Sequence, residues 1–274
     1  MNCLSNSSKV GFIGAGNMAG AMIRGLRKQG LAKDCVAAFD VDREKLQALD
    51  GDCGITIADT AEALITMSET VILAVKPQML VTALAEVKSL FEEQKPLIIS
   101  IAAGTSIETL QGLCGEKVPI IRVMPNLNAT VGEAMSAFCG NALVTDKEKE
   151  TATAILSSFG KVTQLPENQF AAYSALAGCS PAYTMLYMDA LASVGEKYGI
   201  DRQTSLQVVA QAVLGTAKLL AESGEETETW ITRVCSPGGT TIEGIKSLRN
   251  NDVKSQIQQA AEASIARDLE LQKK

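Results

Sequence analysis

Short apolar runs alternate with helical patterns over the first 165 residues of the chain. The runs are continuous, and strands that are buried on both faces of a parallel sheet have this character. Five runs are clear, at residues 10–14, 36–40, 70–75, 97–101 and 120–124, and two weaker ones lie near 134–139 and 161–165. Helical patterns fall between them, at 17–30, 42–50, 60–67, 77–92 and 106–113, and a further helix begins with Thr145 or Asp146 as its N-cap. This alternation predicts an α/β domain with a mostly parallel sheet.

The pattern changes after Pro166, where strand-like runs end and Ala, Leu, Gln and Glu dominate. Helical spacing then recurs at 181–198, 202–222, 225–234, 240–249 and 252–272. Turn-forming residues such as Gly199 and Gly224 separate these helices. We therefore predict two domains, residues 1–165 (α/β) and residues 166–274 (all-helical). The Ala-rich faces of the helical domain can pack within one chain or against a second copy, and the pattern leaves both arrangements open.

The amino-acid composition excludes several classes of binding partner and of catalytic site. It has 274 residues, a formal charge of -6 and no histidine. The acidic balance disfavours binding to a nucleic-acid backbone. Without histidine, Ser-His-Asp hydrolysis and His-ligated metal sites are excluded, and we expect no metal site. Seven scattered cysteines without a CxxC pair indicate reduced thiols in a cytoplasmic protein, with no signal peptide and no membrane span expected.

A glycine-rich turn opens the α/β domain as Gly14-x-Gly16-x-x-Ala19, between a predicted strand and a predicted helix. In this context Gly14 makes the tight turn and Gly16 lets the backbone approach a pyrophosphate, which the helix N-terminus attracts. The domain is therefore predicted to be a Rossmann-type, dinucleotide-binding domain. Asp40, at the end of the second run, is placed to bind the ribose 2′-OH of NADH, or alternatively to cap the next helix. Arg43 can pair with the 2′-phosphate of NADPH, so the choice of cofactor stays open.

Two further segments stand out. The sequence AVKP (74–77) follows the third apolar run, so Lys76 is either a cofactor contact or an ordinary exposed lysine. SPGGTTIEGI (236–245) combines two glycines with hydroxyl residues ahead of a helix, where Thr240 and Glu243 have the spacing of a capping box. Such a turn can hold a small carboxylate, or it can be an ordinary turn between helices. Without histidine, hydride transfer to a C=N bond is favoured, because an imine can arrive already protonated.

The motifs together identify a resemblance to the pyrroline-5-carboxylate reductases. It rests on FIGAGNMAGAM (12–22), AVKPQ (74–78), SIAAGTSIETL (100–110), IIRVMPN (120–126), SPAY (180–183), AQAVLGTAKLL (210–220) and CSPGGTTIEGI (235–245). It covers nearly the whole chain, and the last motif is the most specific. The resemblance implies NAD(P)H-dependent reduction of 1-pyrroline-5-carboxylate to L-proline, the last step of proline biosynthesis. It also implies a homodimer, with a decamer as a larger assembly and active sites completed across chains.

The resemblance assigns roles to particular residues. Those implied to bind NADPH or NADH are Gly14, Gly16, Asn17, Met18, Asp40, Ala74, Val75, Lys76, Pro77, Ala102 and Ala103. Those implied to bind the substrate carboxylate are Ser236, Gly238, Gly239, Thr240 and Thr241. Thr241 is the catalytic candidate, as the residue that orients the ring nitrogen or donates a proton to it. A threonine hydroxyl is a poor acid, which favours the orienting role.

Some positions depart from the usual family pattern. Leu127 and Asn128 follow MPN in place of Thr-Pro, and Ala177 and Cys179 replace two serines near the substrate. These changes keep two alternatives open, a related imine or hydroxyacid reductase and a non-catalytic dinucleotide-binding paralogue. A hydroxyacid dehydrogenase would use a lysine early in the helical domain, and residues 173–196 contain none. The paralogue would be expected to lose the SPGG turn, which this chain keeps.

Overall fold

The computed structural model describes residues 8–271, so Cys3 lies outside the described residues. The packing divides the chain into two compact units. The first runs to Gly178 and includes the chain from Ile265 onward, and the second is Cys179–Ser264. The functional boundary predicted at residue 165 stays a prediction, and the compact units divide later along the chain, after Gly178.

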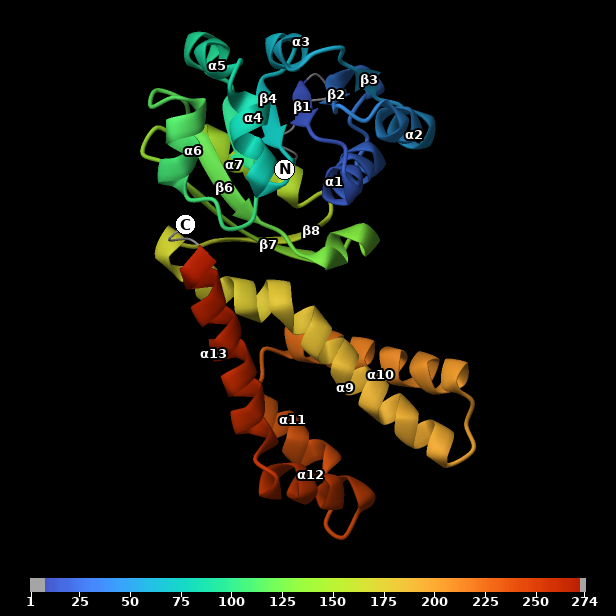
Figure 1. Cartoon of the computed structure of the whole chain (residues 1–274). Coiled ribbons are helices and arrows are strands. Elements are labelled where there is room, and N and C mark those ends of the chain that lie inside the picture. Colours follow the sequence, from blue (N-terminus) through green and yellow to red (C-terminus); the bar gives the residue numbers. More distant parts are fainter. Residues whose placement is uncertain (1–7, 272–274) are drawn as a thin grey trace. The chain divides into compact units, whose positions relative to one another are not determined.

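The first unit is built on an eight-stranded sheet in the order β3-β2-β1-β4-β5-β6-β7-β8 (Figure 1). Its strands are β1 (Val10–Ile13), β2 (Val36–Phe39), β3 (Thr56–Ile57), β4 (Thr70–Leu73), β5 (Leu97–Ser100), β6 (Ile120–Met124), β7 (Ala134–Gly140) and β8 (Gly160–Gln164). Neighbouring strands are parallel except β6 and β7, which are antiparallel. The predicted fold class and the seven predicted strands are confirmed. β3 was not predicted because its two residues are too short to form a pattern.

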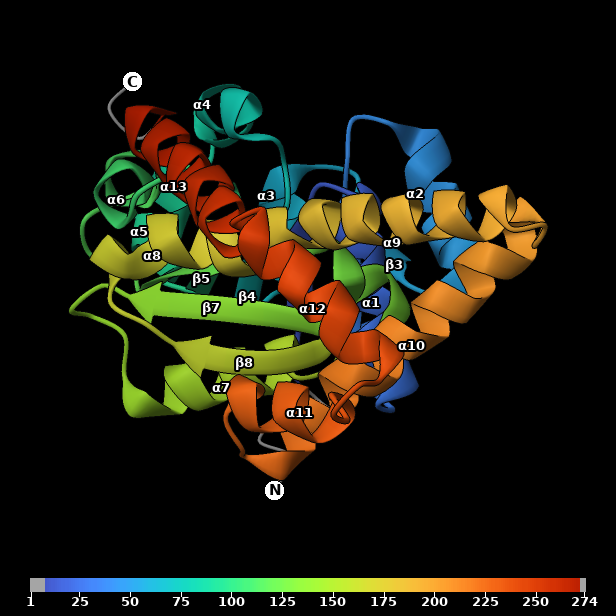
Figure 2. The ribbon, with the colours of Figure 1, turned by 90° about the horizontal axis from the view of Figure 1, so that it is seen from below.

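Helices cover both faces of this sheet. They are α1 (Asn17–Lys28), α2 (Arg43–Cys53), α3 (Ala61–Thr66), α4 (Leu80–Leu84), α5 (Lys88–Gln94), α6 (Ile107–Cys114), α7 (Asp146–Leu156) and α8 (Phe170–Tyr173). Buried residues of α1, α2 and α7 form one core with the sheet, and those of α3 to α6 form another on the opposite face. β7 lies between α7 and α8 (Figure 2). Thr145, one of the two predicted candidates, is the N-cap of α7, and the structure shows that it forms a capping box with Glu148.

The continuous helix predicted over residues 77–92 is wrong. Pro77–Met79 is a 3-10 turn, and α4 and α5 are separate helices. Between them the N–H of Val87 donates to the carbonyl of Leu84, only three residues back, at 3.2 Å. Leu84, Val87 and Phe91 are all buried. The apolar spacing therefore continues across the break, which explains why the pattern resembles one helix.

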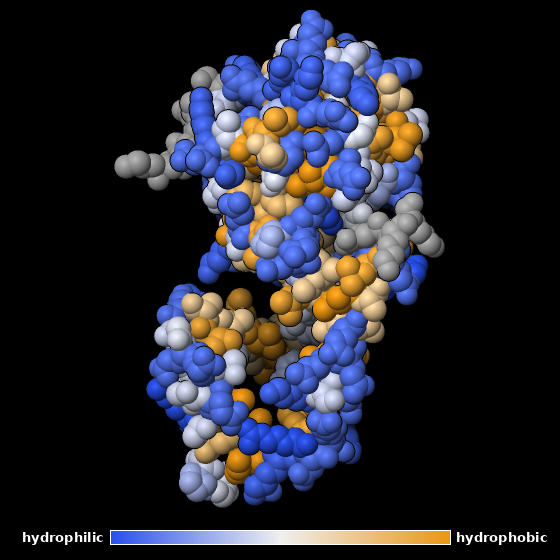
Figure 3. All heavy atoms as spheres, turned by 90° about the vertical axis from the view of Figure 1, so that its left-hand side faces the viewer, coloured by the Kyte–Doolittle hydropathy of each residue, from blue (hydrophilic) through white to orange (hydrophobic). Residues whose placement is uncertain are grey.

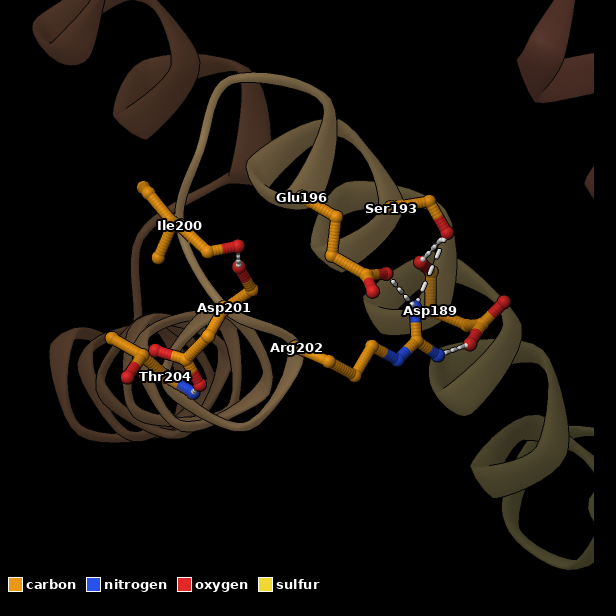
Figure 4. A network of polar contacts seen from close by, with 8 residues as sticks. Asp189, Ser193, Glu196, Ile200, Asp201, Arg202 and Thr204 are labelled. Carbon is orange, nitrogen blue, oxygen red and sulfur yellow. Dashed lines mark hydrogen bonds and ion pairs between the residues drawn. The ribbon is translucent and has the colours of Figure 1, made fainter.

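The second unit is helical, as predicted. Its helices are α9 (Ser180–Lys197), α10 (Arg202–Ser223), α11 (Thr227–Val234), α12 (Thr240–Asn250) and the first part of α13 (Val253–Leu271). A polar cluster joins α9 to α10 (Figure 4), where Arg202 bonds to Asp189, to Ser193 at 3.3 Å and to Glu196 at 3.0 Å. The carboxylates of Asp189 and Glu196 raise the pKa of the guanidinium. The cluster fixes the start of α10 against the side of α9.

This helical unit has almost no core of its own. In α9 to α13 only Ala192 and Ser205 are buried among the described residues. Large apolar side chains remain exposed, including Leu186 at 72% and Val234 at 62%. Figure 3 shows hydrophobic residues on the surface of these helices. A solvated monomer does not favour this much exposed apolar surface, so packing against another protein surface is indicated.

Candidate active site

The glycine-rich turn has the geometry that its sequence predicts. Gly14 has a φ of +107°, which favours glycine, and its N–H donates to the carbonyl of Phe39 at 2.8 Å. A Cβ at this position would lie 2.7 Å from the carbonyl oxygen of Ala74, at the end of β4. The turn therefore packs directly on the neighbouring strand end, with no room for a side chain.

Gly16 serves a different purpose. It is the N-cap of α1 with extended backbone, no side chain caps this helix end, and no acidic residue lies in its first turn. A Cβ on Gly16 would meet no atom within 4 Å, so it would enter open space. Gly16 and Asn17 are exposed, Met18 is half-buried and Ala19 is buried against the sheet. Uncapped N–H groups facing open space fit the pyrophosphate of a dinucleotide.

The side chain of Asp40 is hydrogen-bonded to the glycine-rich turn. Its carboxylate accepts hydrogen bonds from the N–H of Ala15 at 2.7 Å and from the N–H of Asp42 at 2.9 Å. The N-cap of α2 is Asp42, so the alternative that Asp40 caps this helix is wrong. Arg43 is exposed and pairs with Asp59 at 2.9 Å. Asp40 therefore joins the end of β2 to the glycine turn and leaves a negative charge there.

A pocket of about 270 Å³ adjoins the turn, lined by Ala15, Gly16, Asn17, Gly20, Arg24, Lys45, Ala48, Leu49 and Thr130. Its two cationic side chains were not predicted as site residues. Lys45 pairs with Asp42 at 2.9 Å, which raises the pKa of Lys45, and Arg24 pairs with Asp52 at 2.6 Å. The helical spacing of the sequence alone does not show that these two positions meet beside the glycine turn.

The remaining predicted cofactor residues lie at the same edge of the sheet. β1, β4 and β5 are parallel neighbours, so their carboxyl ends meet. Ala74, Val75, Lys76 and Pro77 follow β4, and the N–H of Ala74 donates to the carbonyl of Ile13 at 2.8 Å. After β5, Ala102 is buried and Ala103 is exposed. Lys76 is exposed, so its contact with a cofactor stays a prediction. This edge is where open α/β sheets bind ligands.

The SPGG turn lies in the second unit, between α11 and α12. Gly238 has a φ of +70°, and the N–H of Gly239 donates to the carbonyl of Ser236 at 3.0 Å. The predicted capping box is wrong, because Gly239 is the N-cap and Glu243 instead pairs with Lys246 at 2.8 Å. No side chain caps α12. Its first N–H groups therefore face an exposed surface beside the hydroxyls of Thr240 and Thr241, which fits the binding of an anion.

A pocket of about 440 Å³ lies next to this turn. It is lined by Tyr187, Thr216, Leu219, Leu220, Thr227, Trp230, Ile231, Val234, Cys235, Thr241 and Ile245. Thr241 contributes a hydroxyl to a mostly apolar wall. The indole N–H of Trp230 donates to Ser223 at 3.0 Å, which holds the ring in place. Trp230 was not predicted as a site residue, although it is the one tryptophan of the chain.

Metal and thiol chemistry have little support in this structure. Within residues 8–271, no group of three or more His, Cys, Asp and Glu side chains could hold a metal ion. The six cysteines in this range form no disulfide. Burial raises the pKa of Cys114 and of Cys139 to about 12, so both remain thiols at neutral pH. No helix in the described part is long and apolar enough to cross a membrane.

Comparison with known proteins agrees with this architecture. Residues 9–104 match the family described as NADP oxidoreductase, coenzyme F420-dependent, and residues 167–271 match the family described as pyrroline-5-carboxylate reductase dimerisation. A pyrroline-5-carboxylate reductase of Methanosarcina acetivorans is 36% identical over 269 residues, which are 98% of this chain and 99% of the relative. The chain belongs to the pyrroline-5-carboxylate reductase family. The predicted family is confirmed.

Solved structures of the family agree along the whole chain. A pyrroline-5-carboxylate reductase of Coxiella burnetii has a TM-score of 0.92 at 30% identity, covering 97% of this chain and 98% of its own. The Plasmodium falciparum pyrroline carboxylate reductase, solved with NADP bound, has a TM-score of 0.87 at 26% identity, covering 98% of this chain and 100% of its own. The helical part of the chain is a dimerisation domain of this family. That assignment agrees with its exposed apolar side chains and favours packing against a second copy over packing within one chain.

Proposed function

We propose that this chain reduces 1-pyrroline-5-carboxylate to L-proline with a reduced nicotinamide dinucleotide as hydride donor. The observation that carries the proposal is the pair of uncapped helix N-termini, one following the glycine turn of a Rossmann-type domain and one following the SPGG turn. One suits a pyrophosphate and the other suits a small carboxylate. Membership of the family supplies the identity of the substrate.

The cofactor is assigned to the edge of the sheet in the first unit. Gly14, Gly16, Asn17 and Met18 would hold the pyrophosphate through backbone N–H groups. The nicotinamide half is assigned to two strand-end segments, Ala74–Val75–Lys76–Pro77 and Ala102–Ala103. NADP is the cofactor named for the family matching residues 9–104, and we assign NADPH as the first candidate, with NADH as the alternative. The negative charge of Asp40 opposes a 2′-phosphate, whereas Arg43 favours one.

The substrate is assigned to the second unit. The carboxylate would accept hydrogen bonds from the N–H groups of the turn and from the hydroxyls of Ser236, Thr240 and Thr241. Gly238 permits the turn by its positive φ, and Gly239 permits it because a Cβ there would lie 2.4 Å from the hydroxyl of Ser236. The adjoining apolar pocket suits the carbon ring of a pyrroline.

The reaction needs one hydride and one proton. A reduced dinucleotide held at the glycine turn by Gly14 and Gly16 would supply the hydride for the carbon of the C=N bond. A protonated imine already carries the proton on nitrogen and ends as the neutral secondary amine. Thr241 would accept a hydrogen bond from the N–H of this iminium and so orient the ring. We assign it as the catalytic residue in this orienting role, since a hydroxyl is a poor acid.

The assembly and the compartment follow from the same proposal. The dimerisation domain supports a homodimer, and we propose that the partner subunit completes each active site, with a decamer as the larger form. We place the protein in the cytoplasm, because six described cysteines form no disulfide and a reducing compartment keeps thiols in this state.

The test is a set of threonine variants. Thr241→Ala should lower kcat/KM for 1-pyrroline-5-carboxylate by about 10- to 100-fold, the range expected when one oriented hydrogen bond is lost. Thr241→Ser keeps the hydroxyl and should retain most activity. Thr229→Ala, an exposed threonine of α11, is the matched control. The dissociation constant of NADPH should be equal in all four proteins. Full activity of Thr241→Ala would contradict the role given to Thr241.

A further inference from the structure

The link between the two compact units is one helical run with an irregular middle. α8 continues into a π-helical segment, Ser174–Cys179, which continues into α9. Pro181 lies in the first turn of α9. Proline has no N–H, and its ring crowds the carbonyl four residues back, which here belongs to Ala177. The carbonyl of Ala177 therefore loses its ordinary α-helical donor.

Asn126 supplies a donor in its place. Its amide nitrogen donates to the carbonyl oxygen of Ala177 at 2.9 Å, and its amide oxygen accepts from the N–H of Met135 at 3.2 Å. The residue is only 7% exposed. Asn126 is also the N-cap of a 3-10 helix, Leu127–Val131, but its side chain makes no capping bond there. A side chain of a favoured capping type is thus used to hold the π-helical segment.

The side chain of Tyr173 also holds this run onto the sheet. β7 pairs with β6 only up to Ala137, opposite Met124, so Met135 lies beyond this pairing. The backbone of Met135 is satisfied by side chains, because its N–H binds Asn126 and its carbonyl accepts the hydroxyl of Tyr173 at 2.6 Å. The sequence places Asn126 two residues after the end of β6 and Tyr173 directly before the π-helical segment.

The start of the run is anchored by an ion pair between a buried arginine and a partly exposed glutamate. Arg122, on β6, is 3% exposed and pairs with Glu167 at 2.8 Å. The N–H of Ile107 also donates to Glu167 at 2.8 Å, and the guanidinium of Arg122 lies 4.7 Å from the centre of the Phe170 ring. β6 therefore holds the connecting helix at two levels, through Arg122 and through Asn126.

We propose that Asn126 is a positioning residue for the reaction. It donates to the carbonyl that Pro181 leaves without an α-helical N–H, and it thereby fixes the π-helical segment around Ala177 at the end of the dinucleotide-binding unit. β6 is the parallel neighbour of β5, so Asn126 lies at the sheet edge to which the cofactor is assigned. The inference rests on the proposed function, because positioning is measured through catalysis.

Asn126→Ala removes the donor to Ala177 without touching the glycine turn. We expect kcat for 1-pyrroline-5-carboxylate to fall about tenfold, since small misplacements of reacting groups are costly, and KM for NADPH to stay within about twofold. Tyr173→Phe removes only the hydroxyl that donates to the carbonyl of Met135, and it should lower kcat less than Asn126→Ala does. Asn168→Ala, an exposed asparagine nearby, should behave as the wild type.

A double variant tests the specific contact. Pro181→Ala restores an N–H that can donate to the carbonyl of Ala177. Removing Asn126 should therefore cost less in the Pro181→Ala background, and the double variant should recover at least about threefold in kcat over Asn126→Ala alone. The melting temperatures of the wild type, the two single variants and the double variant should follow the same pattern: Asn126→Ala should lower the melting temperature less in the Pro181→Ala background.

The outcomes separate this inference from the proposed function. If the wild type does not reduce 1-pyrroline-5-carboxylate, the proposed function fails, and the melting temperatures still report the contact between Asn126 and the carbonyl of Ala177. Two results with an active wild type would overturn the positioning role. In the first, Asn126→Ala lowers kcat by the same factor in the wild type and in the Pro181→Ala background. In the second, Asn126→Ala lowers the melting temperature and leaves kcat unchanged.

Discussion

The two glycines of the nucleotide turn should respond to the same substitution in opposite ways. In Gly14→Ala the new Cβ lies 2.7 Å from the carbonyl oxygen and 2.8 Å from the carbonyl carbon of Ala74, at a φ of +107°. Positive φ costs an L-residue about 1–2 kcal/mol, and the overlap with a fixed strand end adds about as much again. The unfolding free energy should fall by about 3 kcal/mol, which lowers the melting temperature of the apo protein by about 6–12 °C.

Gly16→Ala should leave the apo protein nearly unchanged. Its φ is −74°, and the new Cβ meets no atom within 4 Å. Alanine is a poorer N-cap than glycine but costs less conformational entropy, so the net change should stay within about 0.5 kcal/mol. The methyl group would, however, occupy the space assigned to the pyrophosphate. We expect the dissociation constant of NADPH to rise by about 10- to 100-fold, equivalent to about 1.4–2.7 kcal/mol.

The assay pairs thermal unfolding of the apo proteins with a fluorescence titration of NADPH. The difference between Gly14→Ala and Gly16→Ala in melting temperature and in NADPH affinity is the decisive result, because each variant serves as the control for the other. The reasoning would be refuted if Gly16→Ala bound NADPH like the wild type, or if it lowered the apo melting temperature as much as Gly14→Ala.

Three further predictions address charge and burial. Arg43→Ala should weaken NADPH binding several-fold and leave NADH binding unchanged, and equal effects in parallel titrations would remove Arg43 from 2′-phosphate recognition. Burial raises the pKa of Cys114 and Cys139 to about 12, so at pH 8 little thiolate exists and iodoacetamide should spare both until the protein unfolds; peptide mass spectrometry showing early labelling would contradict this. Glu167→Ala leaves Arg122 buried without its carboxylate and should destabilise the protein by about 1–3 kcal/mol in urea unfolding, whereas an unchanged midpoint would show that the ion pair contributes nothing.

Much of the fold was accessible from sequence because its elements are locally encoded. Continuous apolar runs indicated the buried strands, and a helix start was predicted at Thr145 or Asp146, of which the structure has Thr145 as the N-cap. The glycine turn was also predictable, since the spacing of Gly14 and Gly16 between a strand and a helix is a pattern within one short segment. The break between α4 and α5 was not, because apolar residues keep facing the sheet on both sides of it.

Tertiary contacts explain what sequence reasoning missed. Asp40 appeared free to cap a helix, whereas its two oxygens accept backbone N–H groups, one of them in the glycine turn. Asn126 and Ala177 are far apart in the chain, so no local pattern shows that one serves the other. A usable signal did exist in Arg122, a charged residue within the otherwise apolar run 120–124, which indicates a buried partner.

The central claim is hydride transfer from the cofactor to the C=N carbon of a cyclic imino acid. The most direct measurement uses NADPH, and in parallel NADH, carrying deuterium on the transferable position, together with 1-pyrroline-5-carboxylate and the wild-type protein. The account predicts loss of the reduced-nicotinamide absorbance matched by proline that carries one deuterium on the ring carbon of the former C=N bond. Binding of the cofactor without its oxidation, or proline without deuterium at that carbon, would contradict the account.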